Sequence, residues 1–146
     1  SGTVYNYTLL SKVTDSDGNL IESYEPTVKN QIEGISQSTW DAIHSGMRMV
    51  VESHKEFDGF PIAVAGKTGT AQQTGHANHG LFVGYAPYDD PEITIAVRIA
   101  NGYSSHNAAT AARNVISYYY KETSMKDIKE MKAAGANGNI RNSVAD

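Results

Sequence analysis

The hydrophobic residues of this chain fall into short alternating runs separated by turn residues, together with two segments of helical periodicity. The clearest alternation spans residues 92–100, where every second position is Ile or Val and the positions between are Thr, Ala and Arg. A period of two is typical of a β-strand with two different faces. The small alanines on the second face indicate that it also packs against something, most simply a helix.

Two further strands are expected before this one, and together the three predict an antiparallel meander. Residues 62–73 alternate apolar and small residues, and residues 79–86 form another short apolar run. Their connections are short and rich in Gly, Asn, Pro and Asp, which suits antiparallel neighbours. Near the start of the chain, residues 3–24 predict a hairpin around a turn at 14–19, and residues 26–34 an extended connector.

Helical periodicity appears twice. In residues 36–52 apolar residues recur at three- and four-residue steps, with Ser36 or Ser38 as the helix cap; in residues 108–120 they do so again. The two stripes expected to face the core are Trp40, Ile43, Met47, Val50 and Val51, and Ala108, Ala112, Val115 and Tyr119. The predicted fold is therefore α/β (α+β), an antiparallel sheet with helices packed on it. Residues 1–122 form its body, and 123–146 a tail with a short helix at 125–133 before a frayed end.

Length, composition and charge leave one soluble domain as the simplest class. The chain has 146 residues, 40% of them hydrophobic, enough for a core but without a run of about 18 apolar residues that could span a membrane. Its net charge of −4, with no basic block, argues against nucleic acid as a partner. The absence of cysteine excludes disulfides and thiolate chemistry. The chain starts without Met or a signal peptide, which suggests a piece of something longer.

The stretch with the most chemistry is Ala65-Gly66-Lys67-Thr68-Gly69-Thr70-Ala71-Gln72. One lysine, two hydroxyl groups and exposed strand amides suit an extended, anionic peptide. The glycines remove Cβ atoms around Lys67, which allows another backbone to lie close. A Walker phosphate loop is disfavoured, because Pro61 stands where its first glycine belongs and no helix is expected to follow.

Metal sites are also disfavoured. Of the candidate ligands His76, His79 and His106, the first two lie in a glycine-flanked loop with no obvious carboxylate support, and His106 lies in the loop expected at 101–107. His44 and His54 are expected on the solvated side of their segments. The acidic turn at 14–19 lacks the spacing of an EF-hand and its final Glu. We therefore expect neither metal nor cofactor.

The eight residues 65–72 closely resemble the third motif of the class B, monofunctional penicillin-binding transpeptidases. Lys-Thr-Gly is one of three motifs of penicillin-binding proteins and serine β-lactamases. The strand 79–87, the strand 93–99 and a terminal helix follow in the family's order, and the likeness covers about residues 2–120. The resemblance implies a partial penicillin-binding transpeptidase fold. It also implies a parent that cross-links peptidoglycan, anchored at the outer face of the bacterial cytoplasmic membrane.

The resemblance also implies roles for four residues. Lys67 would offer its ammonium to the proton network of the cleft and to the ligand's carboxylate, and Thr68 and Thr70 would donate hydroxyl hydrogen bonds to that carboxylate. The backbone N–H of Thr70 would be half of the oxyanion hole. Gly69 would let the substrate, a D-Ala-D-Ala stem peptide or a β-lactam, add alongside as a strand. A bland alternative is a bulge at Gly69 and an exposed cation at Lys67.

The sequence departs from the family in what it lacks. No serine has a lysine three residues later, so the nucleophile of the Ser-x-x-Lys motif is not in this chain. The one Ser-x-Asn match, Ser105-His106-Asn107, follows Lys-Thr-Gly instead of preceding it and is more simply a helix cap. We therefore expect a C-terminal fragment, inactive alone, whose partner is the upstream part of the same protein. Uncovered apolar surface would favour its oligomerisation. A β-lactam sensor that only binds and an unrelated α/β domain are the alternatives.

Overall fold

A computed structural model describes residues 2–130 of the chain, and it divides into two compact units, Ser1–Ala42 and Ile43–Asp146. The division falls inside a helix, which the hydrophobic pattern did not predict. The sequence-based division into 1–122 and 123–146 stays a prediction. The end of the predicted 125–133 helix and the frayed tail lie outside the described residues.

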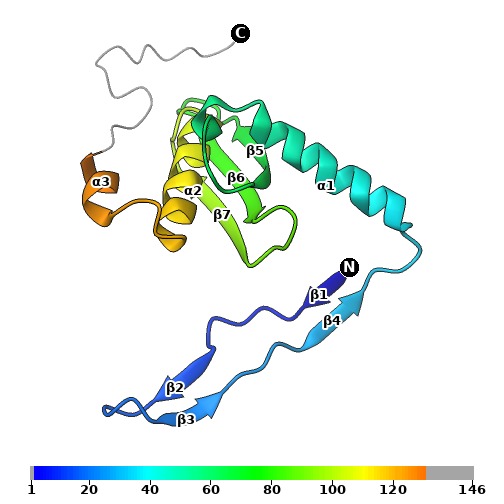
Figure 1. Cartoon of the computed structure of the whole chain (residues 1–146), viewed down its shortest axis with the longest axis vertical. Coiled ribbons are helices and arrows are strands. Elements are labelled where there is room, and N and C mark those ends of the chain that lie inside the picture. The colour runs from blue at the N-terminus through cyan, green and yellow to red at the C-terminus, as the bar shows by residue number, and fades with distance from the viewer. Residues whose placement is uncertain (1, 131–146) are drawn as a thin grey trace. The chain divides into compact units, whose positions relative to one another are not determined.

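The first unit consists of two short antiparallel strand pairs (Figure 1). Strand β2 (Lys12–Thr14) pairs with β3 (Leu20–Ser23), which confirms the expected hairpin turn, whereas β1 (Thr3–Tyr5) pairs with β4 (Val28–Gln31). The segment predicted as an extended connector at 26–34 is extended, but its residues 28–31 form a paired strand, which the prediction did not include. Its residues Lys29, Asn30 and Gln31 show no apolar alternation, so pairing with β1 is what makes them extended.

The turn between β2 and β3 is held by Asp15. Its carboxylate accepts hydrogen bonds from the backbone N–H groups of Asp17 (3.0 Å) and Asn19 (2.8 Å) and from the Asn19 side chain (2.9 Å), and Gly18 adopts φ +88°. The hydrogen bonds from Asn19 and its neighbours lower the pKa of Asp15. The acidic look of this turn is thus explained by turn geometry.

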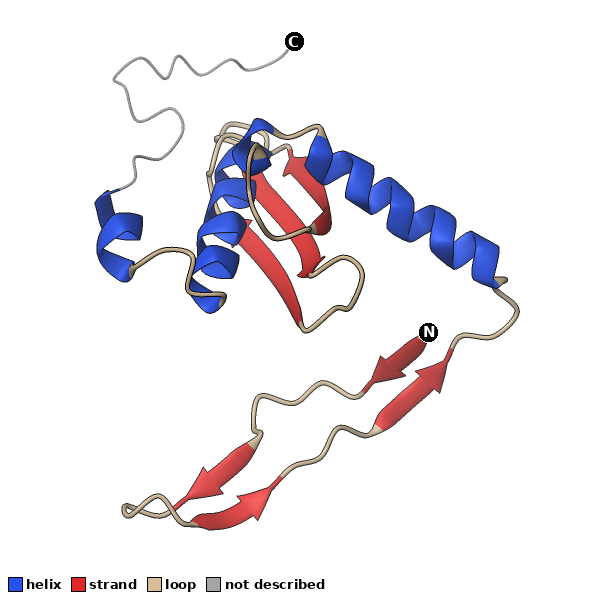
Figure 2. Cartoon of the chain, in the orientation of Figure 1, coloured by secondary structure: helices blue, strands red, loops and turns tan. Residues whose placement is uncertain are grey.

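The second unit is a three-stranded antiparallel sheet with a helix across one face (Figures 1 and 2). The strand order is β5 (Ala65–Ala71), β6 (His79–Ala86), β7 (Ile93–Ile99), which confirms the predicted meander. Helix α2 (Ser105–Tyr119) packs on the face that carries the apolar residues of β7. The core contains Val51, Phe57, Val64, Phe82, Ala86, Ala108, Ala109, Ala112 and Ile116.

The helices differ from the sequence prediction in which side chains they bury. In α2 the buried large residue is Ile116, with no exposed area, whereas Val115 and Tyr119 are 54% and 53% exposed, so placing those two in the core was wrong. In α1 (Gln37–Glu52) Val51 is buried but Ile43 is 46% exposed. Ser36 takes the role of cap, accepting from the Thr39 N–H at 3.2 Å.

Two short helices complete the second unit. The 3₁₀ helix η1 (Lys55–Phe57) lies between α1 and β5, and α3 (Met125–Glu130) follows α2. Phe57 of η1 stacks on Phe82 of β6 with ring centroids 5.9 Å apart, which fixes η1 against the sheet. None of the helices in residues 2–130 is long and apolar enough to cross a membrane.

Candidate functional site

The Lys-Thr-Gly tripeptide lies in the middle of β5, at the edge of the sheet. Within the described chain β5 has β6 as its one strand neighbour, so its other side is unpaired. An edge strand presents backbone N–H and C=O groups that an added strand can use. Within residues 2–130 the sheet order therefore leaves one side of this strand without a partner strand, in line with the exposed strand amides expected here.

Lys67 and Thr68 point to opposite faces of the sheet. The register pairs Thr68 with Phe82, which is buried beneath α2, and pairs Lys67 with Val83 on the other face. Lys67 is exposed, and its ammonium donates to the Thr68 carbonyl oxygen at 2.7 Å. Gly69 shares the face of Lys67, and the exposed Thr70 shares that of Thr68.

The face that carries Lys67 is hollowed into an open pocket of about 370 Å³. Strand residues line it, including Leu81, Val83, Ala96 and Arg98 beside Lys67 and Gly69. This is the second face of β7, where the small side chains predicted a closely packed helix. Among residues 2–130 no helix residue lines the pocket, and α2 covers the opposite face.

The start of β5 is fixed by its neighbours. Arg48 of α1 donates from Nη1 to the carbonyl oxygen of Val64 at 2.8 Å, and Glu52 forms an ion pair with Arg48 at 3.1 Å. A Cβ atom on Gly66 would lie 2.5 Å from the Phe82 ring and 2.8 Å from the Val83 carbonyl oxygen. This glycine therefore allows a close approach within the sheet itself.

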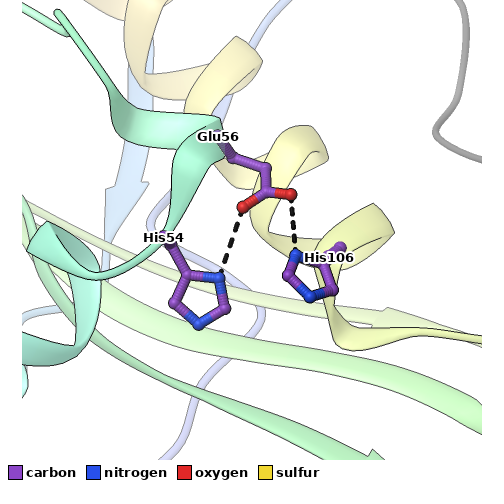
Figure 3. A group of neighbouring side chains, drawn as sticks. All are labelled: His54, Glu56 and His106. Carbon is purple, nitrogen blue, oxygen red and sulfur yellow. Dashed lines mark hydrogen bonds and ion pairs between the residues drawn. The ribbon is translucent and has the colours of Figure 1, made fainter.

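Thr68 contacts a cluster of ionisable side chains on the α2 side. Its Oγ1 lies 3.4 Å from Nε2 of His54, whose Nδ1 lies 3.3 Å from Glu56 Oε2. The other carboxylate oxygen of Glu56 lies 2.7 Å from Nδ1 of His106 (Figure 3). A chain of contacts thus runs from α2 through η1 to the Lys-Thr-Gly strand.

Glu56 is ionised in this setting. Partial burial acts to raise its pKa, but a hydrogen bond from its own backbone N–H and the contacts with His106 and His54 outweigh burial, so the pKa lies below its usual value. An ionised carboxylate only accepts hydrogen bonds, so each imidazole presents an Nδ1–H to it.

The surroundings of the histidines differ from those that the sequence predicted. His54 is not on a solvated surface: its side chain is 14% exposed and turned toward Glu56. His79 bonds instead to the N–H of Asn101 (3.1 Å) and contacts Arg98 (3.2 Å). No sequence spacing joins His54 to His106, so only the packing of η1 against α2 could reveal the cluster.

The Ser-x-Asn match at residues 105–107 forms the first turn of α2. The cap is Ser104, one residue earlier, which accepts from the N–H of His106 at 3.2 Å. Asn107 donates from its side chain to the Gly102 carbonyl oxygen at 2.9 Å, which closes the turn before the helix. The match thus lies at the start of a helix, but taking it as the cap was wrong, because Ser104 is the cap and residues 105–107 belong to the helix.

Comparison with known proteins places these features in a family. The model of the penicillin binding protein transpeptidase domain matches residues 1–117. Peptidoglycan D,D-transpeptidase MrdA of Haemophilus influenzae is 33% identical over 128 residues, 73% of this chain and 20% of that protein. Penicillin-binding protein 2B of Streptococcus pneumoniae is 31% identical over 117 residues, 71% of this chain and 17% of that protein. The chain thus spans about a fifth of the length of these relatives.

Solved structures show the same fold. The D,D-transpeptidase domain of a peptidoglycan glycosyltransferase from Eggerthella lenta aligns with a TM-score of 0.66 and 28% identity, over 83% of this chain and 28% of that chain. Penicillin-binding protein A of M. tuberculosis, in its imipenem acyl-enzyme complex, aligns with a TM-score of 0.68 over 82% of this chain and 27% of that chain; at 22% identity it supports the fold alone. The partial transpeptidase fold expected from the motif is confirmed, and the chain belongs to the penicillin-binding protein transpeptidase domain family.

Proposed function

We propose that this chain supplies the Lys-Thr-Gly wall of the acyl-transfer site in a peptidoglycan D,D-transpeptidase. The observation that carries the proposal is the position of Lys67, Thr68 and Gly69 on β5, the edge strand of the three-stranded sheet within residues 2–130, in a chain whose family is established. A D-Ala-D-Ala stem peptide, or a β-lactam in its place, would add along β5 as an extra strand.

The roles within this wall follow from the two faces of β5. Lys67 projects on the open face, where its ammonium is available to the ligand's carboxylate and to the proton network of the cleft. The Lys67 ammonium already donates to the Thr68 carbonyl oxygen. Because Thr68 and Thr70 are two residues apart, their backbone N–H and C=O groups point to the same side of the strand. An outward Thr70 N–H would supply half of an oxyanion hole, worth about 3–4 kcal/mol of transition-state stabilisation.

The nucleophile would come from outside this chain. The match to about a fifth of MrdA leaves room in the parent for a Ser-x-x-Lys serine, which would be acylated by the stem peptide and then release the acyl group to an acceptor amine. The open pocket beside Lys67 is a surface that such an upstream part could cover. The parent would be anchored at the outer face of the bacterial cytoplasmic membrane.

The test uses the full-length parent and a fluorescent penicillin. Lys67→Ala should abolish covalent labelling while circular dichroism shows an unchanged fold, because the exposed side chain supports chemistry and not packing. Lys29→Ala, an exposed lysine on β4, is the matched control and should label normally. Near-normal labelling of Lys67→Ala would contradict the role given to this lysine.

A second measurement separates a transpeptidase from a module that only senses β-lactams. The parent is expected to release D-alanine from a peptide ending in D-Ala-D-Ala in the presence of an acceptor amine. Stable penicillin labelling without any release of D-alanine would favour the sensor.

A further inference from the structure

Three side chains able to bind a metal converge beside β5, although they come from separate parts of the chain. His54 precedes η1, Glu56 lies within η1, and His106 lies in the first turn of α2. One ligand atom from each lies within 4.8 Å of the other two (Figure 3). Among residues 2–130 these are the three that meet in this way.

The cluster is already arranged around its centre. Both Nδ1 atoms point at the Glu56 carboxylate, at 3.3 Å from His54 and 2.7 Å from His106, and the two imidazole rings lie 5.1 Å apart. Phe57, next to Glu56, is anchored on Phe82 in the core. The side chains therefore already lie close together, and metal binding at Nδ1 would shift each ring proton from Nδ1 to Nε2.

We propose that His54, Glu56 and His106 form a zinc site. Two imidazole nitrogens and one carboxylate oxygen are a known set of three protein ligands for Zn²⁺, with water in the fourth position. At metal–ligand distances of about 2.0–2.1 Å, tetrahedral ligands lie roughly 3.4 Å apart. The separations of 2.7 and 3.3 Å run to the two different oxygens of Glu56, so its carboxylate would turn to offer one oxygen to a metal shared with both rings, and one ligand atom from each of the three residues already lies within 4.8 Å of the others.

Burial and ligand chemistry both support zinc. His54 and Glu56 are 14% and 15% exposed, which shields their bonds to the metal, whereas His106 is 53% exposed and leaves a path for entry and for water. Imidazole suits Zn²⁺, while Mg²⁺ and Ca²⁺ prefer sites made only of oxygen.

Zinc at this position would also act on Thr68. A metal bound to His54 Nδ1 leaves the ring proton on Nε2, which lies 3.4 Å from Thr68 Oγ1. His54 would then donate to the Thr68 oxygen, and the Thr68 hydroxyl hydrogen would be directed at a bound carboxylate. This link rests on the proposed function, whereas zinc binding itself does not.

The test measures Zn²⁺ alone, by equilibrium dialysis with elemental analysis, on the full-length protein and its variants. Glu56→Gln and His106→Ala should each lose one bound equivalent of Zn²⁺, or lower the affinity for Zn²⁺ by more than 10–100-fold. That range is typical of losing a residue that only hydrogen-bonds to a metal ligand. His76→Ala, an exposed loop histidine, should keep the wild-type stoichiometry. Excess Mg²⁺ should not displace the zinc.

Thermal unfolding shows whether each variant is folded and whether Zn²⁺ stabilises it. Zn²⁺ should raise the Tm of the wild type and of His76→Ala, but not that of folded Glu56→Gln, because a ligand that binds only the native state stabilises it. Equal zinc stoichiometry and equal Tm shifts in wild type and Glu56→Gln would overturn the site. Penicillin labelling that proceeds at the same rate with and without bound zinc would leave the site standing and overturn its link to Thr68.

Discussion

Gly66 and Gly69 flank the two central residues of the Lys-Thr-Gly strand, yet they have different surroundings. A Cβ on Gly66 would press on the Phe82 ring and on backbone, whereas a Cβ on Gly69 would meet the nearest atom, Leu81 Cβ, at an ordinary 3.5 Å. Neither glycine has a positive φ. Packing inside the sheet thus requires glycine at position 66. At position 69 the sheet itself has room for a methyl group, so a glycine there matters only for a ligand that adds along the strand.

This difference predicts separate effects of alanine at the two positions. Gly66→Ala should lower the free energy of unfolding by about 1–3 kcal/mol, because the new methyl group overpacks against Phe82 and the Val83 carbonyl. Gly69→Ala should change it by less than about 0.5 kcal/mol. Urea unfolding measures both, and equal losses at the two positions would contradict the assignment.

For ligand binding, unlike for stability, we expect the substitution at Gly69 to matter. Gly69→Ala, although stable, should slow penicillin labelling of the full-length protein because the added methyl group projects from the strand along which the ligand adds. A Gly69→Ala protein that labels at the wild-type rate would contradict strand addition at β5.

At the level of the element, the buried stripe of α2 differs from the predicted stripe by one residue, with Ile116 in place of Val115. Residues 108, 112, 115 and 119 follow a helical repeat as well as 108, 109, 112 and 116 do. A helix offers several adjoining stripes, so the choice among them depends on which one faces the sheet. The packing of β6 and β7 selects Ile116, which is fully buried, over Val115.

Alanine substitutions at these neighbours should therefore differ. Ile116→Ala removes a buried side chain and leaves a cavity, at an expected cost of about 2–5 kcal/mol in the free energy of unfolding. Val115→Ala, at a site 54% exposed, should stay within about 0.5 kcal/mol of the wild type. Chemical denaturation distinguishes them, and a larger loss at Val115 would show that another stripe faces the core.

At the scale of the whole molecule, the proposed function makes this chain one wall of a site whose nucleophile would lie elsewhere in the parent protein. In that proposal Lys-Thr-Gly would contribute recognition, and no serine in the sequence has the lysine partner at the family's spacing. Recognition and nucleophile would therefore lie in separate parts of the parent protein.

The 146-residue chain alone should form no covalent adduct with a fluorescent penicillin. Gel fluorescence after denaturation is the measurement, with the full-length protein as the positive control. A stable stoichiometric adduct on the chain itself would contradict its dependence on an outside nucleophile.

Uncovered surface leads to a related expectation for the isolated chain. Large apolar side chains are exposed in the first unit, including Leu9, Leu20, Ile21 and Val28. Surface of this kind favours self-association. Analytical ultracentrifugation should detect oligomers, and a monomer at all concentrations would contradict the expectation.

What the sequence determined by itself was local. Turn residues and a period of two located β6 and β7 closely, and the Lys-Thr-Gly context led to the family, because these signals lie within a few consecutive residues. Tertiary structure decided the rest: that β4 pairs with β1, that Ile116 faces the core, and that His54, Glu56 and His106 meet beside Thr68. Such contacts join residues far apart along the chain, and their geometry depends on packing that no single segment encodes.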